Sequence, residues 1–152
     1  RDRSVSRGLG DVYKRQAEIQ ALIREAFAAQ KFAYVPYSHF HVGAALRGKN
    51  GQVFRGCNIE NASYTPTNCA ERTALFKAVS EGVREFDAIA IVGSKVGETN
   101  TLVTGPCGVC RQALYEFGGP ELTVIMARSE DDYIVTSLGD LLPYGFGPAN
   151  LE

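Results

Sequence analysis

The 152-residue sequence has no tryptophan, a single methionine and only four cysteines. Four cysteines are too few for the disulfide framework of a small secreted protein, so we expect a cytoplasmic protein. The sequence also lacks an apolar run of the ~20 residues that a membrane-spanning helix needs, and it shows no secretory signal pattern. With 16 basic and 17 acidic side chains, it has no basic excess for holding a nucleic-acid backbone. We therefore expect no membrane and no nucleic-acid partner.

The charge is distributed unevenly along the chain. Residues 1–16 carry five basic and two acidic side chains, whereas residues 17–152 carry 11 basic and 15 acidic ones. The first segment shows no helical or strand period. Its functional interpretation is a basic arm that binds an anionic partner. We expect instead that residues 1–16 are a non-native or disordered extension, and that residues 17–152 form one domain with a sizeable core.

The hydrophobic pattern of that domain alternates between helices and strands. An Asn-Gly turn at Asn50 and Gly51 predicts a tight hairpin. Helix and strand periods and glycine stop signals place the remaining elements. The predicted helices cover residues 17–32, about 68–82, 108–119 and 137–143, and the predicted strands cover 40–48, 52–60, 86–94, 121–128 and possibly 132–135. Since strands joined through helices are parallel neighbours, we predict an α/β fold with a mixed sheet layered with helices.

Three of the four cysteines fall at predicted helix starts. Cys69 follows Asn68, a good N-cap residue, and Cys107 and Cys110 form a C-x-x-C turn. The positive end of a helix favours the thiolate, which is the form that binds zinc. Three protein ligands would leave a fourth position for water, as in a catalytic zinc site. A redox pair, or half of a structural zinc site, is the alternative reading of C-x-x-C alone.

Glu71 and Arg72 strengthen the catalytic interpretation. Glu71 lies in the first helical turn beside Cys69, where a carboxylate can act as general acid and base for a metal-bound water. Arg72 lies three residues from Cys69 on the same helix face and could hydrogen-bond the ligand sulfurs. The alternatives are an ordinary acid in a helix first turn and a solvated surface arginine.

These motifs carry a family resemblance. N-C-A-E-R-T-A at residues 68–74 and P-C-G-V-C-R-Q at residues 106–112 resemble the zinc-dependent cytidine deaminases of the small homotetrameric type. Y-V-P-Y-S-H-F-H-V-G-A-A-L at residues 34–46 and G-C-N-I-E-N-A-S-Y at residues 56–64 extend the likeness, which does not reach residues 1–16. The resemblance implies a three-layer α-β-α fold with a five-stranded mixed sheet, and a Cys-Cys-Cys rather than a His-Cys-Cys ligand set.

The resemblance also implies a reaction. One Zn²⁺ held by Cys69, Cys107 and Cys110 would activate water to attack C4 of free cytidine or deoxycytidine. Glu71 would pass the proton to ring N3 and then to the departing amine. The products would be uridine or deoxyuridine and ammonia, a reaction of pyrimidine salvage.

The resemblance implies substrate contacts that are shared between subunits of a homotetramer. The implied contacts are Asn58 and Glu60 at the ribose hydroxyls, Phe40 and a neighbour's Phe146 at the base, Tyr64 across the interface, and the Ala70 and Cys107 backbones at the base edges. Without the motifs, the alternative interpretation of Asn58 and Glu60 is an exposed face at a strand end. The alternative for Phe40 and for Phe146 is an ordinary residue of the hydrophobic core.

Other substrates and roles remain open at this stage. The alternative substrates are a related nucleoside such as a nucleoside antibiotic, a nucleotide, or cytosine within a polynucleotide. The alternative role is a non-catalytic binding module that zinc stabilises. A carboxylate at Glu60 would repel a phosphate, and the acidic domain disfavours a nucleic acid. Cys57 is either a fourth ligand that closes the site or a buried free thiol, and we expect the thiol. We expect His39 and His41 to be ordinary loop or strand residues.

Overall fold

The protein is described by a computed structural model that covers residues 3–99 and 101–152. Helices and strands alternate along the chain much as the hydrophobic pattern predicts. The elements are α1 (Arg3–Gln30), β1 (Phe40–Gly48), β2 (Val53–Cys57), α2 (Ala70–Ser80), β3 (Phe86–Lys95), α3 (Gly108–Gly118), β4 (Thr123–Ala127), β5 (Tyr133–Ser137), α4 (Leu138–Leu141) and the 3₁₀ helix η1 (Pro148–Leu151).

The five strands form one mixed sheet in the order β2-β1-β3-β4-β5. Strands β3 and β4 are parallel because the chain crosses over through α3 between them, whereas the other neighbouring strands are antiparallel. The predicted mixed sheet is confirmed, including its fifth strand, which covers Tyr133–Ser137.

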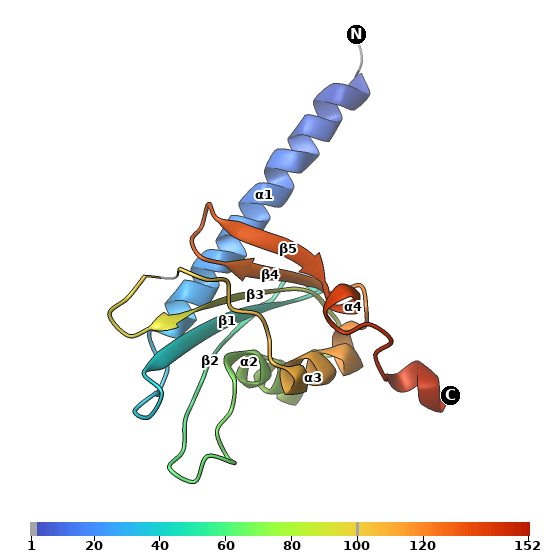
Figure 1. Ribbon diagram of the computed structural model, residues 1–152. Helices are drawn as coiled ribbons and strands as arrows, with labels where there is room; N and C mark the ends of the chain where they lie inside the picture. The colour runs from blue at the N-terminus through green and yellow to red at the C-terminus, as the bar shows by residue number, and fades with distance from the viewer. Residues whose placement is uncertain (1–2, 100) are drawn as a thin grey trace.

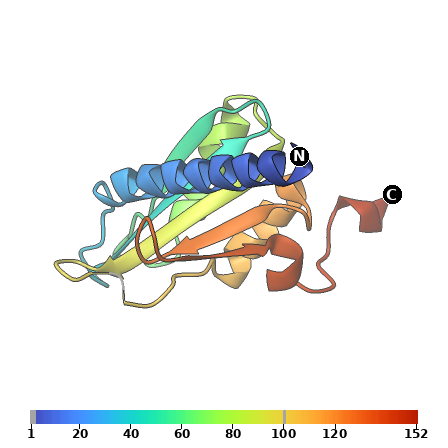
Figure 2. The same cartoon turned by 90° about the horizontal axis from the view of Figure 1, so that it is seen from above.

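Helices cover both faces of this sheet (Figures 1 and 2). Helix α1 lies on one face, where Leu22, Ile23 and Ala26 pack in a buried cluster with small and branched residues of β1, β3 and β4. Helices α2 and α3 lie on the other face over a second cluster that includes Leu75 and Leu114. The arrangement is the predicted three-layer α-β-α architecture.

A glycine brings α2 very close to the sheet. A Cβ added at Gly56 on β2 would lie 2.3 Å from the carbonyl oxygen of Ala70, the first residue of α2. Any side chain at position 56 would therefore push the start of α2 away from the strand. The first turn of α2, which contains Glu71, is thereby fixed against β2.

Helix α1 begins earlier than the sequence pattern indicates. We expected it to start near Ala17, but it starts at Arg3. Residues 10–18 are exposed, and packing on the sheet begins at Ile19. Figure 1 shows the first part of α1 projecting past the sheet. Residues 10–18 have no face buried on the sheet, and an apolar helical period is accordingly absent from them. That residues 1–16 lie outside the domain stays a prediction.

No helix within residues 3–99 and 101–152 is both long and apolar enough to cross a membrane.

Candidate active site

Two helix starts bring three thiols together. Cys69 precedes α2 and Cys107 precedes α3 as the N-cap residues, and Cys110 lies in the first turn of α3. The three Sγ atoms lie within 4.8 Å of one another. Cys110 is buried, Cys69 is half-buried and Cys107 is exposed, so the cluster has a closed side and an open side. The sequence prediction that these three cysteines converge is confirmed.

The spacing of the sulfurs fits a tetrahedral zinc ion. Zn–S bonds of about 2.3 Å at tetrahedral angles place two sulfurs about 3.8 Å apart. The Sγ atoms of Cys69 and Cys107 are 3.8 Å apart. Three thiolates supply a soft donor set of the kind that zinc selects, and they leave one tetrahedral position for a fourth ligand.

Electrostatics favour thiolate at Cys69. A hydrogen bond with Cys110 lowers the pKa of the Cys69 thiol to about 5, and Arg72 contributes further. The pKa of Cys110 is raised by the same hydrogen bond. The Arg72 Nη2 donates to the Cys69 Sγ at 3.5 Å. Within the described residues the Arg72 Nε is buried without a hydrogen-bond partner. The Arg72 guanidinium is therefore anchored on the Cys69 sulfur through Nη2, while its role beside the thiols stays a prediction.

Glu71 is a buried carboxyl next to this cluster. Only 4% of its surface is exposed. Burial raises its pKa to about 7, and negative charge at Cys69 acts in the same direction. A carboxyl that titrates near neutrality can both accept and release a proton in the same reaction cycle. The environment of Glu71 is therefore suited to general acid and base chemistry rather than to a surface role.

The helix cap differs from the prediction. Asn68 is not the N-cap of α2, because the helix starts at Ala70 and the N-cap is Cys69, which makes no side-chain capping bond. The Asn68 amide instead donates to the Thr73 hydroxyl at 3.1 Å. The first backbone N–H groups of α2 thus face the region of the sulfurs, where they favour negative charge.

Asn58 and Glu60 lie beyond the end of β2 rather than on it. The predicted strand over residues 52–60 stops at Cys57. Asn58 Oδ1 accepts from the Val42 N–H and its Nδ2 donates to the Phe40 carbonyl, both at 2.9 Å. These two bonds replace the strand pairing and fix the Asn58 amide against β1. Each amide atom keeps further hydrogen-bonding capacity for a ligand.

Glu60 is held by the segment before β1. Its Oε1 accepts from the backbone N–H groups of Tyr37 and Ser38 at 3.0 and 3.1 Å. Hydrogen bonding from Ser38 and, to a smaller extent, from Tyr37 keeps the pKa of Glu60 below its ordinary value. Both backbone bonds go to Oε1, so they fix the carboxylate beside residues 37 and 38.

A hollow forms beside this carboxylate. Its walls are Tyr37, Ser38, Glu60, Tyr64 and Thr67. Tyr64 is 72% exposed, has a positive φ of 64° and stands edge-on to the Tyr37 ring at a centroid distance of 6.2 Å. The sequence predicted Glu60 and Tyr64 but missed Tyr37 and Ser38, which contribute through their backbone. Pro36, which disfavours helix in the preceding residue, was the available signal of an irregular segment.

The comparisons with known proteins fit this geometry. The family model of the cytidine and deoxycytidylate deaminase zinc-binding region matches residues 16–126, which is most of the chain. The chain belongs to this deaminase family. The match includes Cys69, Cys107 and Cys110, and together with the sulfur spacing it supports one zinc ion per chain.

Individual members of the deaminase family are also similar to the chain. A cytidine deaminase of Sporosarcina psychrophila is 46% identical over 135 residues, which cover 89% of this chain and 96% of the relative. The crystal structure of cytidine deaminase from Burkholderia pseudomallei has a TM-score of 0.75 and 53% identity, over 83% of this chain and 97% of that chain. The expected deaminase fold is thereby confirmed. A blasticidin-S deaminase of Bacillus cereus is 33% identical over 106 residues, 68% of this chain and 74% of the relative.

The remaining residues that resemble deaminase contacts are dispersed. Phe40 begins β1 and is half-buried, and Ala70 is fully buried at the start of α2. Phe146 lies near the C-terminus with 55% of its surface exposed, and it does not line the hollow beside Glu60. Its proposed role at a neighbour's site is therefore not visible within a single chain.

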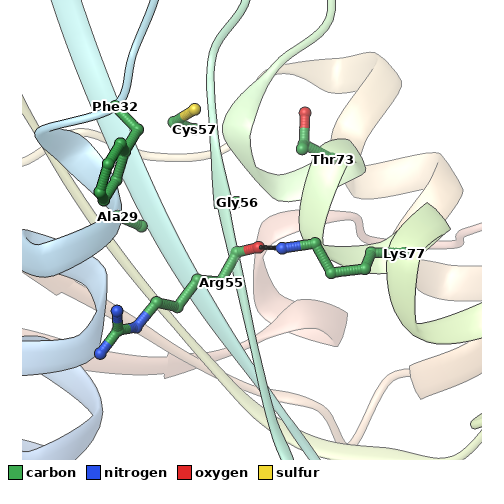
Figure 3. A pocket seen from close by; sticks show the side chains of 7 residues that line it. All are labelled: Ala29, Phe32, Arg55, Gly56, Cys57, Thr73 and Lys77. Carbon is green, nitrogen blue, oxygen red and sulfur yellow. Dashed lines mark hydrogen bonds between the residues drawn. The ribbon is translucent and has the colours of Figure 1, made fainter.

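Cys57 lies outside the metal cluster. Within the described residues the thiols grouped closely enough to bind a metal are Cys69, Cys107 and Cys110. Cys57 lines a separate pocket between α1, β2 and α2, near Phe32 and Thr73 (Figure 3). Burial raises the pKa of its thiol. This placement agrees with a free thiol, which is half-buried rather than fully buried.

Proposed function

We propose that this protein catalyses the zinc-dependent hydrolytic deamination of free cytidine and deoxycytidine to uridine and deoxyuridine, with release of ammonia. The observation that carries the proposal is the buried carboxyl of Glu71 beside three convergent thiols. Membership of the deaminase family supports the same reaction class. The reaction consumes one water and one cytidine or deoxycytidine and forms one uridine or deoxyuridine and one ammonia, so the chemistry requires proton transfers but no redox partner.

The protein groups have distinct roles in this proposal. Cys69, Cys107 and Cys110 would hold zinc, which when bound supplies a Lewis acid that makes water nucleophilic near neutral pH. Glu71 takes one proton from the attacking water and delivers it to N3 of the pyrimidine as the C4–O bond forms. It then takes the proton of the new C4 hydroxyl and delivers it to the amine, so that the C4–N bond breaks, ammonia leaves and the C4 carbonyl forms. The Glu71 pKa of about 7 suits both directions of transfer. Arg72 offsets the negative charge of the thiolates through its bond to Cys69.

The hollow beside Glu60 supports the proposed contacts to the ribose. Glu60 and Asn58 are proposed to bind the ribose hydroxyls, and the backbones of Ala70 and Cys107 the edges of the base. Phe40 is proposed to pack against the base. The carboxylate of Glu60, whose pKa is lowered, stays ionised at neutral pH and would repel a nucleotide phosphate. This charge supports a free nucleoside as the substrate.

We infer that the active form is a homotetramer with sites shared between subunits. Tyr64 and Phe146 support this because both are exposed aromatic side chains on irregular segments. A cytoplasmic location is supported by the thiol ligands, which an oxidising compartment would convert to disulfides or oxidised sulfur acids. The reaction would then belong to pyrimidine salvage.

A second candidate is a deaminase of a nucleoside antibiotic. The similarity to the blasticidin-S deaminase of Bacillus cereus favours it, at lower identity than the similarity to cytidine deaminases. A carboxylate placed to bind hydroxyls favours a ribose over a modified sugar. Comparison of kcat/KM for cytidine and for blasticidin S separates the two candidates.

The experiment that tests the mechanism compares zinc-loaded wild type with Glu71→Ala. Wild type is expected to form uridine and ammonia in equal amounts from cytidine. The variant is expected to fold and retain one zinc per chain but to lose about 10²- to 10⁴-fold in kcat, since a general acid–base contributes that much. Undiminished turnover by the variant at full zinc content would refute the role of Glu71. A zinc-loaded wild type that forms no uridine or ammonia would instead leave a non-catalytic zinc module as the better description of this site.

A further inference from the structure

One face of α3 binds the C-terminal segment of the chain. We call residues 142–152 the C-terminal tail. Arg111 Nη1 donates to the carbonyl of Leu141, the last residue before the tail, at 2.7 Å. Gln112 Nε2 donates to the carbonyl of Phe146, within the tail, at 2.8 Å. Figures 1 and 2 show that the chain beyond these contacts runs away from the body of the domain to η1.

The Tyr115 ring fills the space beside two glycines of the tail. A Cβ added at Gly145 or at Gly147 would lie 2.8 Å from a ring carbon of Tyr115. Real Cβ atoms do not approach other atoms that closely, so any side chain at either position would displace the tail or the ring. The tail can therefore lie against α3 only because positions 145 and 147 have no side chain.

This arrangement sets the direction of Phe146. The residue lies between the two glycines that face Tyr115, and its carbonyl is bound by Gln112. The backbone on both sides is in contact with α3, whereas the Phe146 ring is 55% exposed. An exposed ring on a fixed backbone is suited to contact with another molecule.

Arg111 links the tail to the zinc-binding turn. Its Nε donates to the Pro106 carbonyl at 2.7 Å, one residue before Cys107. The same guanidinium thus binds the turn that supplies a zinc ligand and the end of α4 where the tail begins. Hydrogen bonds from a charged guanidinium are stronger than neutral ones, so this link is rigid.

We propose that Arg111, Gln112 and Tyr115 form a docking face for the tail, and that this face positions Phe146 for the pyrimidine bound at a neighbouring subunit. The inference rests on the proposed function. The three are positioning residues, because they act on the substrate through Phe146. Loosening the tail lowers the time that Phe146 spends in its binding position. It should therefore raise KM and leave kcat nearly unchanged, since Glu71 and the zinc ligands are untouched.

The test uses two tail variants and one control. Gly147→Ala places a Cβ against Tyr115, and Gln112→Ala removes the bond to the Phe146 carbonyl. Glu116→Ala changes an exposed residue of the same helix. Each tail variant is expected to raise KM for cytidine about 3- to 10-fold, the range for one aromatic contact, with kcat within about twofold. Glu116→Ala is expected to leave both constants unchanged.

A second measurement separates positioning from a general loss of structure. In a Phe146→Ala background, Gly147→Ala and Gln112→Ala should raise KM no further, because the ring that they position is gone. The chain has no tryptophan, so Phe146→Trp gives a single tryptophan whose fluorescence can be excited selectively over that of the seven tyrosines. Its fluorescence anisotropy should fall when Gly147→Ala or Gln112→Ala is added.

The possible failures are distinguishable. A wild type that does not deaminate cytidine would contradict the proposed function. A wild type that deaminates cytidine while Gly147→Ala and Gln112→Ala keep its KM would overturn this inference alone. Equal KM increases with and without Phe146 would also overturn it. Gln112 is exposed, so Gln112→Ala tests the inference even where Gly147→Ala does not fold.

Discussion

At the scale of single residues, the proposed chemistry depends on Glu71 and the three convergent thiols. The sequence singled out all four, because C-x-x-C and a cysteine beside a glutamate are close together along the chain. It did not show that the Asn58 amide is already bound to the backbone of Phe40 and Val42. That contact spans 16 to 18 residues and depends on where β2 ends, which is set by packing and not by local pattern.

The separate position of Cys57 makes a prediction about metal content. Cys57→Ser should keep one zinc per chain and wild-type activity, because its thiol lies outside the cluster. Cys110→Ser should lose most of the bound zinc, since the replaced sulfur is one of the three ligands. Metal analysis of both purified variants checks this. Zinc loss in Cys57→Ser would indicate a closed four-cysteine site instead.

His41 gives a prediction about pH and stability. On the α1 side of β1, the Gln30 amide donates to the His41 carbonyl at 3.1 Å, and the His41 Nε2 lies 3.4 Å from the Ser94 hydroxyl. Burial lowers the pKa of His41 from 6.5. The unfolded chain therefore binds more protons here, and stability is lost as pH falls through and below 6.5.

The comparison variant for His41 is His41→Gln, which cannot titrate in this range. Urea unfolding of both proteins at pH 8 and pH 5 gives the difference in unfolding free energy. Relative to His41→Gln, the wild type should have a lower unfolding free energy at pH 5 than it has at pH 8. An equal difference at both values would show that His41 does not contribute to the pH dependence of folding.

At the scale of elements, amphipathic segments with strong stop signals were predicted most accurately. Helix α3 was expected over residues 108–119 and covers Gly108–Gly118, and β3 was expected over 86–94 and covers Phe86–Lys95. Both have an apolar pattern bounded by glycine or by a polar residue. The attachment of the tail to α3 was not predicted, since glycines in a loop pattern do not show which surface they allow the backbone to approach.

Helix α1 leads to a prediction about truncation. Packing of α1 begins at Ile19, and residues 10–18 are exposed. Removal of residues 1–16 should therefore change the thermal midpoint by less than about 2 °C and keep kcat/KM within about twofold. Thermal unfolding and activity assays of the truncated chain check this. Insolubility or loss of activity would show that the first part of α1 belongs to the domain.

At the scale of the whole molecule, the proposed active form has more than one chain contributing to each active site. Light scattering combined with an activity assay is expected to find a tetramer across the concentrations at which the enzyme works. Phe146→Ala should weaken substrate binding without loss of zinc, because Phe146 does not belong to the metal cluster. A fully active monomer would contradict the proposed sharing of sites.

The protein is proposed to deaminate free nucleosides at a zinc centre. The most direct measurement is a deamination assay, with zinc per chain quantified, over cytidine, deoxycytidine, cytosine and cytidine monophosphate. We predict turnover of both nucleosides, with uridine or deoxyuridine and ammonia formed in equal amounts. Cytosine lacks the ribose contacts and the monophosphate faces Glu60, so each should show kcat/KM lower by about 10- to 100-fold. Zinc-loaded protein that releases no ammonia from either nucleoside would contradict the account.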